Sequence, residues 1–303
     1  MEPAPTSRLR RWAVRLPLGL AGLVVLYYAV GMVAAHKIDD DLAFSAGHPA
    51  PEHSRAVAIA ARLIFREVDI HQWVANDPVF KPSALLDNMP AFQQGLLAGL
   101  SRFAATLSAI EGQDPELDRA AGLLKYPGTV WKFDPRTSWA PTASAEKQYR
   151  AAARNLDIFN ERLSAGEARY DRSAESLRTL LIHAIADLSV AADALDSHLV
   201  EDRSIFLDFD ADTLFYTTKG RLYAHALITR ELGADFAELL AKRNLDDLWS
   251  TLLLSLNRAA SLDPPVVLSG AGDATLLPSH LTAQGYHLLQ ARAKMAAIAA
   301  RLG

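Results

Sequence analysis

Three groups of residues in this chain have types and spacings that could support chemistry. Asp208, Asp210 and Asp212 have the alternating carboxylates that open a calcium-binding EF-hand loop. Such a loop requires glycine at its sixth position and a bidentate glutamate at its twelfth, where this chain has Thr213 and Lys219. The pattern therefore favours acids at the N-terminus of a helix, with a looser Ca²⁺ site as the alternative.

The second group, Ser144 to Lys147, matches the Ser-x-x-Lys nucleophile pattern of penicillin-recognising enzymes. Those enzymes also need S-D-N-like and K-T-G elements, and the sequence has neither. Because serine is a favoured N-cap residue, Ser144 is predicted instead to begin a helix after Pro141. We predict no catalytic residue.

The third group is an aromatic stretch between residues 126 and 139. Aromatic rings on a rigid loop can stack on sugar faces, and basic groups between them can hold the carboxylates of a glycan or peptide. The alternative is that the rings pack the loop against neighbouring helices. We expect Trp131 to be mostly buried and Trp139 to be partly exposed, because Trp139 lies at the exit of the loop. The predicted ligand surface consists of Tyr126, Trp131, Phe133, Arg136 and Trp139.

The amino-acid composition of the chain excludes several kinds of functional site. The chain has no cysteine, which excludes disulfides, zinc–thiolate sites, Fe–S clusters and thiol catalysis. The nine histidines are scattered, and no His-Glu-x-x-His motif occurs. The net charge of −4 does not favour a nucleic-acid surface. We therefore predict no metal, no cofactor and no nucleic-acid partner.

Residues 16 to 35 form twenty consecutive positions without a charge. A helix of that length spans the roughly 30 Å hydrocarbon layer of a membrane at about 1.5 Å per residue. Basic flanks stay on the cytoplasmic side, so the tail of residues 1–15 is predicted inside and the rest of the chain outside. The basic residues before the span are Arg8, Arg10, Arg11 and Arg15, and the acidic residues after it are Asp39, Asp40, Asp41 and Glu52.

A cleavable signal peptide is the competing interpretation of this segment. Val33 and Ala35 have the small-residue pattern that precedes a cleavage site, which would lie before His36. The apolar run is longer than the usual signal-peptide core of about 7–15 residues, which favours an uncleaved anchor. Both interpretations export the same domain.

Helical periodicity dominates the rest of the chain and predicts an all-α fold. The last helix is predicted to begin after Ser279, with Leu281, Leu288, Met295 and Leu302 repeating every seven residues as a bundle seam. Only two stretches, 205–209 and 217–218, have strand-like composition, and they are too short for a sheet. The other predicted helices are 55–74, 83–107, 149–163, 170–200, 219–232, 234–241 and 244–260.

The order of these segments predicts a membrane-tethered helical bundle. A cytoplasmic tail (1–15) precedes the transmembrane anchor (16–35). A juxtamembrane linker (36–54), rich in Pro and Gly near its end, precedes a helical periplasmic domain (55–303).

Several stretches together resemble a family of uncharacterised bacterial membrane-anchored proteins, a catalogued domain of unknown function. The resemblance implies a Gram-negative source, an inner-membrane anchor and one soluble domain, and it supplies no catalytic or binding residues. The stretches that carry it are PSALLDNMPAFQ (82–93), GLLKYPGTVWKFDPRTSWAP (122–141), TASAEKQYRAA (142–152), FYTTKGRLY (215–223) and LPSHLTAQGYHLL (277–289).

These observations favour a single-pass inner-membrane protein whose periplasmic helical domain is a binding or scaffold module rather than an enzyme. Its expected partners are the lipid bilayer, through residues 16–35, and another envelope protein or a glycan. One alternative is a hydrolase of envelope polymers, which would need two carboxylates about 5–10 Å apart in a cleft, one with a raised pKa. Another is a periplasmic ligand binder that uses the aromatic loop from Tyr126 to Trp139.

Overall fold

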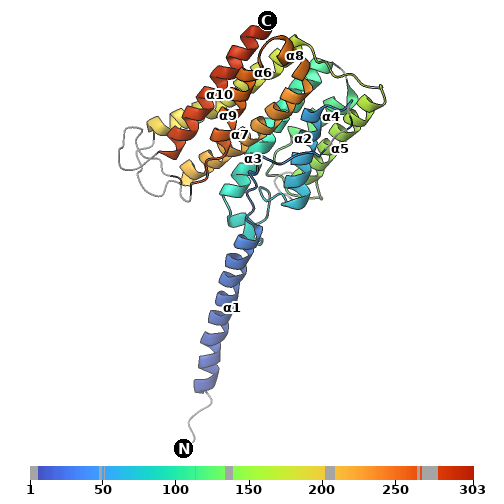
Figure 1. Ribbon diagram of the computed structural model, residues 1–303. Coiled ribbons are helices and arrows are strands. Elements are labelled where there is room, and N and C mark those ends of the chain that lie inside the picture. The colour runs from blue at the N-terminus through green and yellow to red at the C-terminus, as the bar shows by residue number, and fades with distance from the viewer. Residues whose placement is uncertain are drawn as a thin grey trace, which may run out of the picture.

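The protein is all-α, as predicted, and has one long helix that projects from a helical domain (Figure 1). The computed structural model describes residues 6–47, 50, 52–112, 114–133, 139–201, 209–264, 267 and 279–303. Within these ranges there are ten α-helices and no strand. The helices are α1 (Thr6–Ala35), α2 (Arg55–Phe65), α3 (Asn88–Glu111), α4 (Pro115–Leu124), α5 (Ala145–Ser164), α6 (Ala174–Glu201), α7 (Phe209–Asp235), α8 (Ala237–Lys242), α9 (Asp246–Ala260) and α10 (His280–Leu302).

Two short helices of other types join these elements. A π-helix, η1 (Arg66–Ile70), continues α2 without a break, and a 3₁₀ helix, η2 (Pro82–Leu85), precedes α3. α3 was predicted to begin after Ser83, but it begins at Asn88, where the Asp87 carboxylate caps the first N–H. The periodicity of the apolar residues did not reveal α4, although Asp114 followed by Pro115 is a common helix start.

α7 is longer than the predicted helix 219–232 and includes a stretch of strand-like composition. It begins at Phe209, with Asp210 and Asp212 in its first turn, and it continues through the strand-like pair Thr217–Thr218. Carboxylates near a helix N-terminus interact favourably with the helix dipole. Asp210 and Asp212 therefore occupy the helix start that the sequence favoured over a calcium site, while Asp208 lies outside the described residues.

α7 runs through the middle of the domain and packs against α3 most extensively. The two helices cross closely because glycines face each other at the contact. A Cβ on Gly95 would lie 1.9 Å from the Thr217 carbonyl oxygen, and a Cβ on Gly220 would lie 2.0 Å from the Phe92 carbonyl oxygen. α2 covers α7 on one side, with α5 and α4 beyond it, and α9, α10 and α6 complete the bundle on the other side.

α10 has the seam that its heptads predict. Ser279 occupies the N-cap and accepts a hydrogen bond from the Thr282 N–H, at 3.1 Å. The side chains that follow at heptad spacing are buried against α6 and α9, while the neighbouring Leu289 is 54% exposed. The buried set is Leu281, Gln284, Leu288, Ala291, Met295, Ile298 and Leu302.

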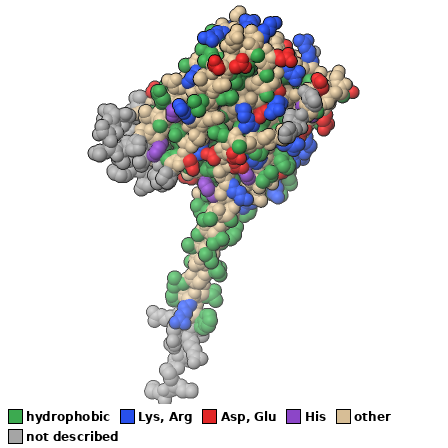
Figure 2. All heavy atoms as spheres, in the orientation of Figure 1, with side chains coloured by type: hydrophobic (Ala, Val, Ile, Leu, Met, Phe, Trp, Pro, Cys, Tyr) green, Lys and Arg blue, Asp and Glu red, His purple; other side chains and the backbone are tan. Residues whose placement is uncertain are grey.

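α1 differs from every other helix because its side chains lie outside the core. Residues 12–35 form the one helix in the described part of the chain that is long and apolar enough to cross a membrane. None of the apolar window of this helix is buried by the domain. Figure 2 shows hydrophobic side chains along this helix up to the point where it meets the domain.

Candidate functional site

Residues 36–46, here called the strap, connect α1 to the domain and lie against α2 and α7. Ile38, Leu42 and Phe44 are partly buried on the core. The strap lies within the predicted linker 36–54, yet its backbone is held by side chains from the domain. Arg66, Lys219, Tyr223 and Arg230 make these contacts and are called the clamp.

Arg66 is the largest fully buried side chain in the described part of the protein. Its guanidinium donates to the Asp39 carbonyl at 2.8 Å and to the Tyr223 hydroxyl at 2.9 Å. It also pairs with the Glu67 carboxylate at 2.9 Å, and it lies 4.6 Å from the centre of the Phe44 ring. Burial by itself lowers the pKa of Arg66, but the surrounding carboxylates and hydroxyl raise it, so the buried group keeps its charge.

The local geometry of η1 brings two adjacent charged residues into the interior. Arg66 and Glu67 are both buried at the point where α2 changes into the wider π-helix. π-Helical turns are rare and are often found at functional sites. The second oxygen of Glu67 accepts a hydrogen bond from the Gln93 amide at 3.2 Å, so the carboxylate is paired on both sides.

Lys219 holds the strap from α7. Its ammonium is fully buried and lies 2.8 Å from the Asp40 carboxylate and 3.1 Å from the Asp263 carboxylate. Burying an ammonium is costly unless it is paired, and the pairing here ties the strap and the segment after α9 to the same helix. Lys219 is the residue that breaks the EF-hand pattern in the sequence.

Two further side chains continue the clamp along α7. The Tyr223 hydroxyl donates to the Asp41 carbonyl at 2.8 Å. Arg230 donates to the carbonyls of Leu42 and Phe44, both at 2.7 Å. Positions 219, 223 and 230 are four and seven apart, which places them on one face of a helix. A polar stripe on α7 therefore binds the strap residue by residue.

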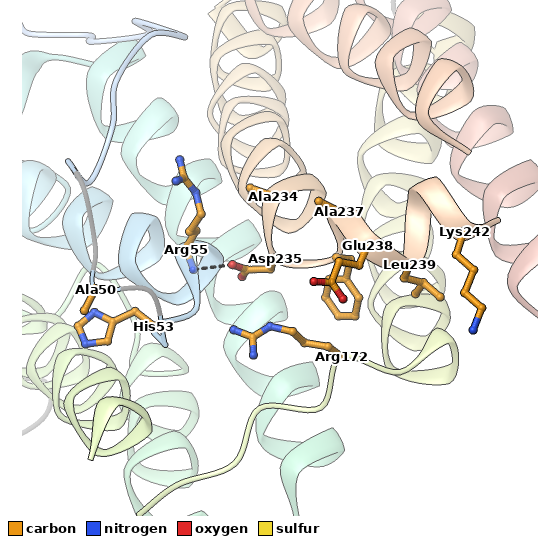
Figure 3. Close-up of a pocket in the computed structure, with 11 residues that line it drawn as sticks. Ala50, His53, Arg55, Arg172, Ala234, Asp235, Ala237, Glu238, Leu239 and Lys242 are labelled. Carbon is orange, nitrogen blue, oxygen red and sulfur yellow. Dashed lines mark hydrogen bonds between the residues drawn. The ribbon is translucent and has the colours of Figure 1, made fainter. Parts of the chain in front are cut away.

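A surface pocket of about 680 Å³ lies at the end of the domain opposite α1 (Figures 1 and 3). It is formed where the start of α2 meets the junction of α7 and α8. Figure 3 shows Asp235 at its centre, with Arg172 beside it and Lys242 farther away along α8. His53, Arg55 and Glu238 also line the pocket.

In this pocket the Asp235 carboxylate accepts hydrogen bonds from the start of α2. One carboxylate oxygen accepts from the Arg55 N–H at 2.8 Å, and the other accepts from the Ser54 hydroxyl at 2.7 Å and the Ala56 N–H at 3.1 Å. These donors are the otherwise unpaired start of α2. Burial raises the pKa of Asp235 even though these donors lower it. Because both oxygens are occupied, the arrangement caps a helix and does not resemble a free general acid.

A second hollow, of about 480 Å³, is a groove whose lining includes α3, α6 and α7. We call it the Asp187 groove. Arg102, Lys125 and Arg221 line it, and the buried Asp187 is its carboxylate. Trp73 and Tyr149, whose ring centres are 5.0 Å apart, provide an aromatic wall.

Asp187 is the centre of a charge cluster within this groove. It lies 2.8 Å from Nε2 of the buried His225 and 3.2 Å from Arg221, with Arg102 at 3.8 Å. Burial alone raises the pKa of Asp187, but its hydrogen bond to His225 and the two arginines lower it overall. Nε of Arg221 is buried and has no hydrogen-bond partner among the described residues.

The aromatic loop divides into a packed part and an exposed part. Tyr126 is partly buried on the core, and its hydroxyl donates to the Ala143 carbonyl at 2.8 Å. Its own carbonyl accepts from the Tyr149 hydroxyl at 2.7 Å. Tyr126 is therefore held inside the loop, and the structure does not bring it together with the other predicted ligand residues.

The exposed part contains three of the predicted ligand residues. Trp131 packs edge-to-face against Phe133, with ring centres 5.5 Å apart, and against Phe80 at 5.9 Å. Trp131 is mostly buried, as expected, whereas Trp139 is 93% exposed, which is more than the partial exposure predicted. The fifth predicted residue, Arg136, lies outside the described residues. Phe80 could not be predicted as a neighbour of Trp131, because it belongs to a distant loop earlier in the chain.

Ser144 occupies the N-cap of α5, as predicted. Among the described residues, no group of three or more His, Asp or Glu side chains could hold a metal ion. No protein-family model, curated protein or solved structure matches this chain. The resemblance to a family of membrane-anchored proteins therefore stays a prediction.

Proposed function

We propose that this chain is a single-pass inner-membrane protein whose helical domain stands in the periplasm as a binding or scaffold module of the cell envelope. α1 has the length and composition of an anchor. The excess of arginine before it and of aspartate after it favours a cytoplasmic N-terminus. The partners are the bilayer and another envelope protein or a glycan.

The observation that supports a scaffold best is the clamp on the strap. Arg66, Lys219 and Arg230 bind the chain directly after α1, so the domain does not hang from a flexible linker. A module fixed in this way presents its surface at a constant height and orientation above the membrane. In the pocket around Asp235 the hydrolase alternative is less favoured, because the donors that cap α2 occupy both oxygens of that carboxylate.

The topology can be tested with fusions to the full chain. A reporter that is active only outside the cytoplasm should be active after Gly303 and inactive before Arg8. The opposite pattern would overturn the orientation. A mature chain that begins at His36 would overturn the uncleaved anchor.

The clamp can be tested by limited proteolysis of the protein in membranes. The strap should resist cleavage in the wild-type protein and become sensitive when Arg66 and Lys219 are both replaced by alanine. A matched control replaces Arg178 and Lys242, two cations at the surface. Equal cleavage of the strap in the wild type and in the clamp variant would contradict a rigid scaffold.

A second candidate function is the binding of an acidic ligand in the Asp187 groove. The supporting observation is the excess of positive charge, since Arg102, Lys125 and Arg221 line the groove against one carboxylate. A small di- or tricarboxylate that binds there should raise the thermal unfolding temperature of the protein. Arg102→Gln should abolish that shift and Arg178→Gln should preserve it.

A further inference from the structure

The loop that contains η2 is attached to the side of α1. The Tyr28 hydroxyl donates to the Val79 carbonyl at 2.5 Å, and the Tyr27 hydroxyl donates to the Phe80 carbonyl at 3.2 Å. Pro82 packs on Gly31 so closely that a Cβ at Gly31 would lie 2.3 Å from its ring. These contacts lie several residues before α1 ends at Ala35, so the loop reaches back along the helix.

The length of the apolar helix sets the level at which this loop meets the membrane. The segment from Trp12 to Ala35 has 24 residues. At about 1.5 Å per residue it is roughly 36 Å long, against about 30 Å for the hydrocarbon layer. A span that begins at Trp12, four residues before the predicted anchor 16–35, leaves the hydrocarbon near Gly31, and Arg15 then extends its charge back to the headgroups. Tyr27 and Tyr28 lie about one helical turn, roughly 5 Å, below this point, close to the boundary at which membrane helices are rich in tyrosine and tryptophan.

The side chains around this attachment are apolar and exposed. Val79 is 81% exposed, and Phe80 and Leu85 are each 58% exposed. Trp131 and Phe133 extend the surface through the ring contacts with Phe80. These five residues are called the basal patch. Figure 2 shows hydrophobic side chains on the underside of the domain, next to the point where α1 enters it.

The ammonium of Lys132 lies above two rings of the patch. The Lys132 ammonium lies 5.8 Å from the centre of the Trp131 ring and 5.4 Å from that of Phe133. A lysine above apolar side chains can bury its stem and extend its charge to a lipid phosphate. Aromatic rings, aliphatic side chains and a basic group together are typical of surfaces that lie in the membrane interface.

We infer that the basal patch inserts into the outer leaflet of the membrane that α1 crosses, at the boundary between the headgroups and the acyl chains. The inference rests on the proposed membrane anchor. We infer lipid as the partner of this surface because the patch adjoins α1. The backbone of its loop is hydrogen-bonded to Tyr27 and Tyr28 of that helix. The domain is thus held by the strap on one side and seated on the bilayer through the patch on the other.

The test uses tryptophan fluorescence of the full chain in vesicles of phosphatidylethanolamine and phosphatidylglycerol, with and without brominated acyl chains. Bromine quenches only indoles that lie in the bilayer. Trp73 and Trp249 are buried in the domain. A Trp12→Phe variant should keep a quenchable component that comes from Trp131, the tryptophan of the basal patch. Adding Trp131→Phe and Trp139→Phe should abolish that component.

A second pair of variants tests the patch itself. Phe80→Asp should abolish bromine quenching in the Trp12→Phe background, and Leu289→Asp, at an exposed position on α10, should leave it unchanged. If the Trp12→Phe protein is quenched by aqueous iodide and not by bromine, the patch faces water and the inference is wrong.

A third variant separates this inference from the anchor. In a protein with Trp131→Phe and Trp139→Phe, bromine quenching reports on Trp12 alone. Quenching there without quenching of the patch would overturn the inference and leave the anchor intact. A loss of both signals would overturn the anchor and, with it, the inference.

Discussion

The seam of α6, α9 and α10 and the clamp on the strap both bury their side chains, but different forces stabilise them. Leu281, Leu288 and Met295 are fully buried, and their stabilisation depends on the apolar area removed from water. Arg66 and Lys219 are as deeply buried and depend on partners at hydrogen-bond distance. Apolar burial is non-directional, whereas a buried charge must find a particular partner. The seam therefore supplies stability, and the clamp fixes where the strap lies.

The strongest test of the seam is a charge placed within it. Leu288→Asp should lower the free energy of unfolding by more than about 4 kcal/mol, because it buries a carboxylate without a partner. Leu289→Asp is the matched control. Its neighbouring position is exposed, so the change should stay within about 0.5 kcal/mol. Urea unfolding of the full chain in detergent, followed by circular dichroism, measures both, and equal losses would contradict the seam.

The corresponding test of the clamp removes one charge. Arg66→Met should cost about 3 kcal/mol, because it leaves the buried Glu67 carboxylate without its cation. Arg55→Met is the control and should cost less than about 1 kcal/mol, because the Arg55 side chain is partly exposed and its partner Glu231 keeps the ion pair with Arg230.

A double variant shows whether the destabilisation comes from the lost Arg66–Glu67 ion pair or from the change in side-chain volume. Arg66→Met combined with Glu67→Gln should recover part of the loss, because no buried charge then remains unpaired. A double variant whose loss of stability equals or exceeds the sum of the two single losses would show that the unpaired charge does not cause the destabilisation.

The same contrast explains what could be predicted from the sequence. The helices and the α10 seam were predictable because apolar burial repeats every turn and leaves a local pattern. α4 was missed because it is short and its apolar residues are mostly Ala and Leu with little contrast. The strand-like pair Thr217–Thr218 was misleading because β-branched residues are tolerated in a helix that is packed on all sides.

The contacts of the clamp leave no periodic pattern in the sequence. Arg66 and Asp39 are distant in sequence, and Lys219 and Asp40 are farther apart still, so no spacing indicates that they pair. Only the stripe of Lys219, Tyr223 and Arg230 on one face of α7 was visible in principle. For the basal patch, the sequence predicted the aromatic loop as a possible binding surface. It did not predict the contact of this loop with Phe80, which depends on the fold.

Asp187 combines features of both regions, because its charge is buried beside the apolar core. Its lowered pKa means that the folded protein binds the proton more weakly than the unfolded chain does. The carboxylate therefore stabilises the protein above its ordinary pKa of about 3.9, and this stabilisation is lost as the pH falls through the folded value. Asp187→Asn should cost about 1.5–3 kcal/mol at pH 7, through the lost charged hydrogen bonds. The difference from the wild type should shrink below about pH 4, and a constant difference would contradict the charge pairing.

The smallest effect is expected where neither apolar packing nor charge pairing holds a side chain. Trp139 is almost fully exposed, so Trp139→Ala should change the free energy of unfolding by less than about 0.5 kcal/mol. Trp249 is the matched control, because it is buried on α9 and its replacement by alanine should cost about 3–5 kcal/mol. Urea unfolding in detergent compares the two variants. If Trp139→Ala costs as much as Trp249→Ala, the indole of Trp139 is packed and is not available to a partner. If the cost is negligible, this indole contributes nothing to the fold and its exposed surface is available to a partner.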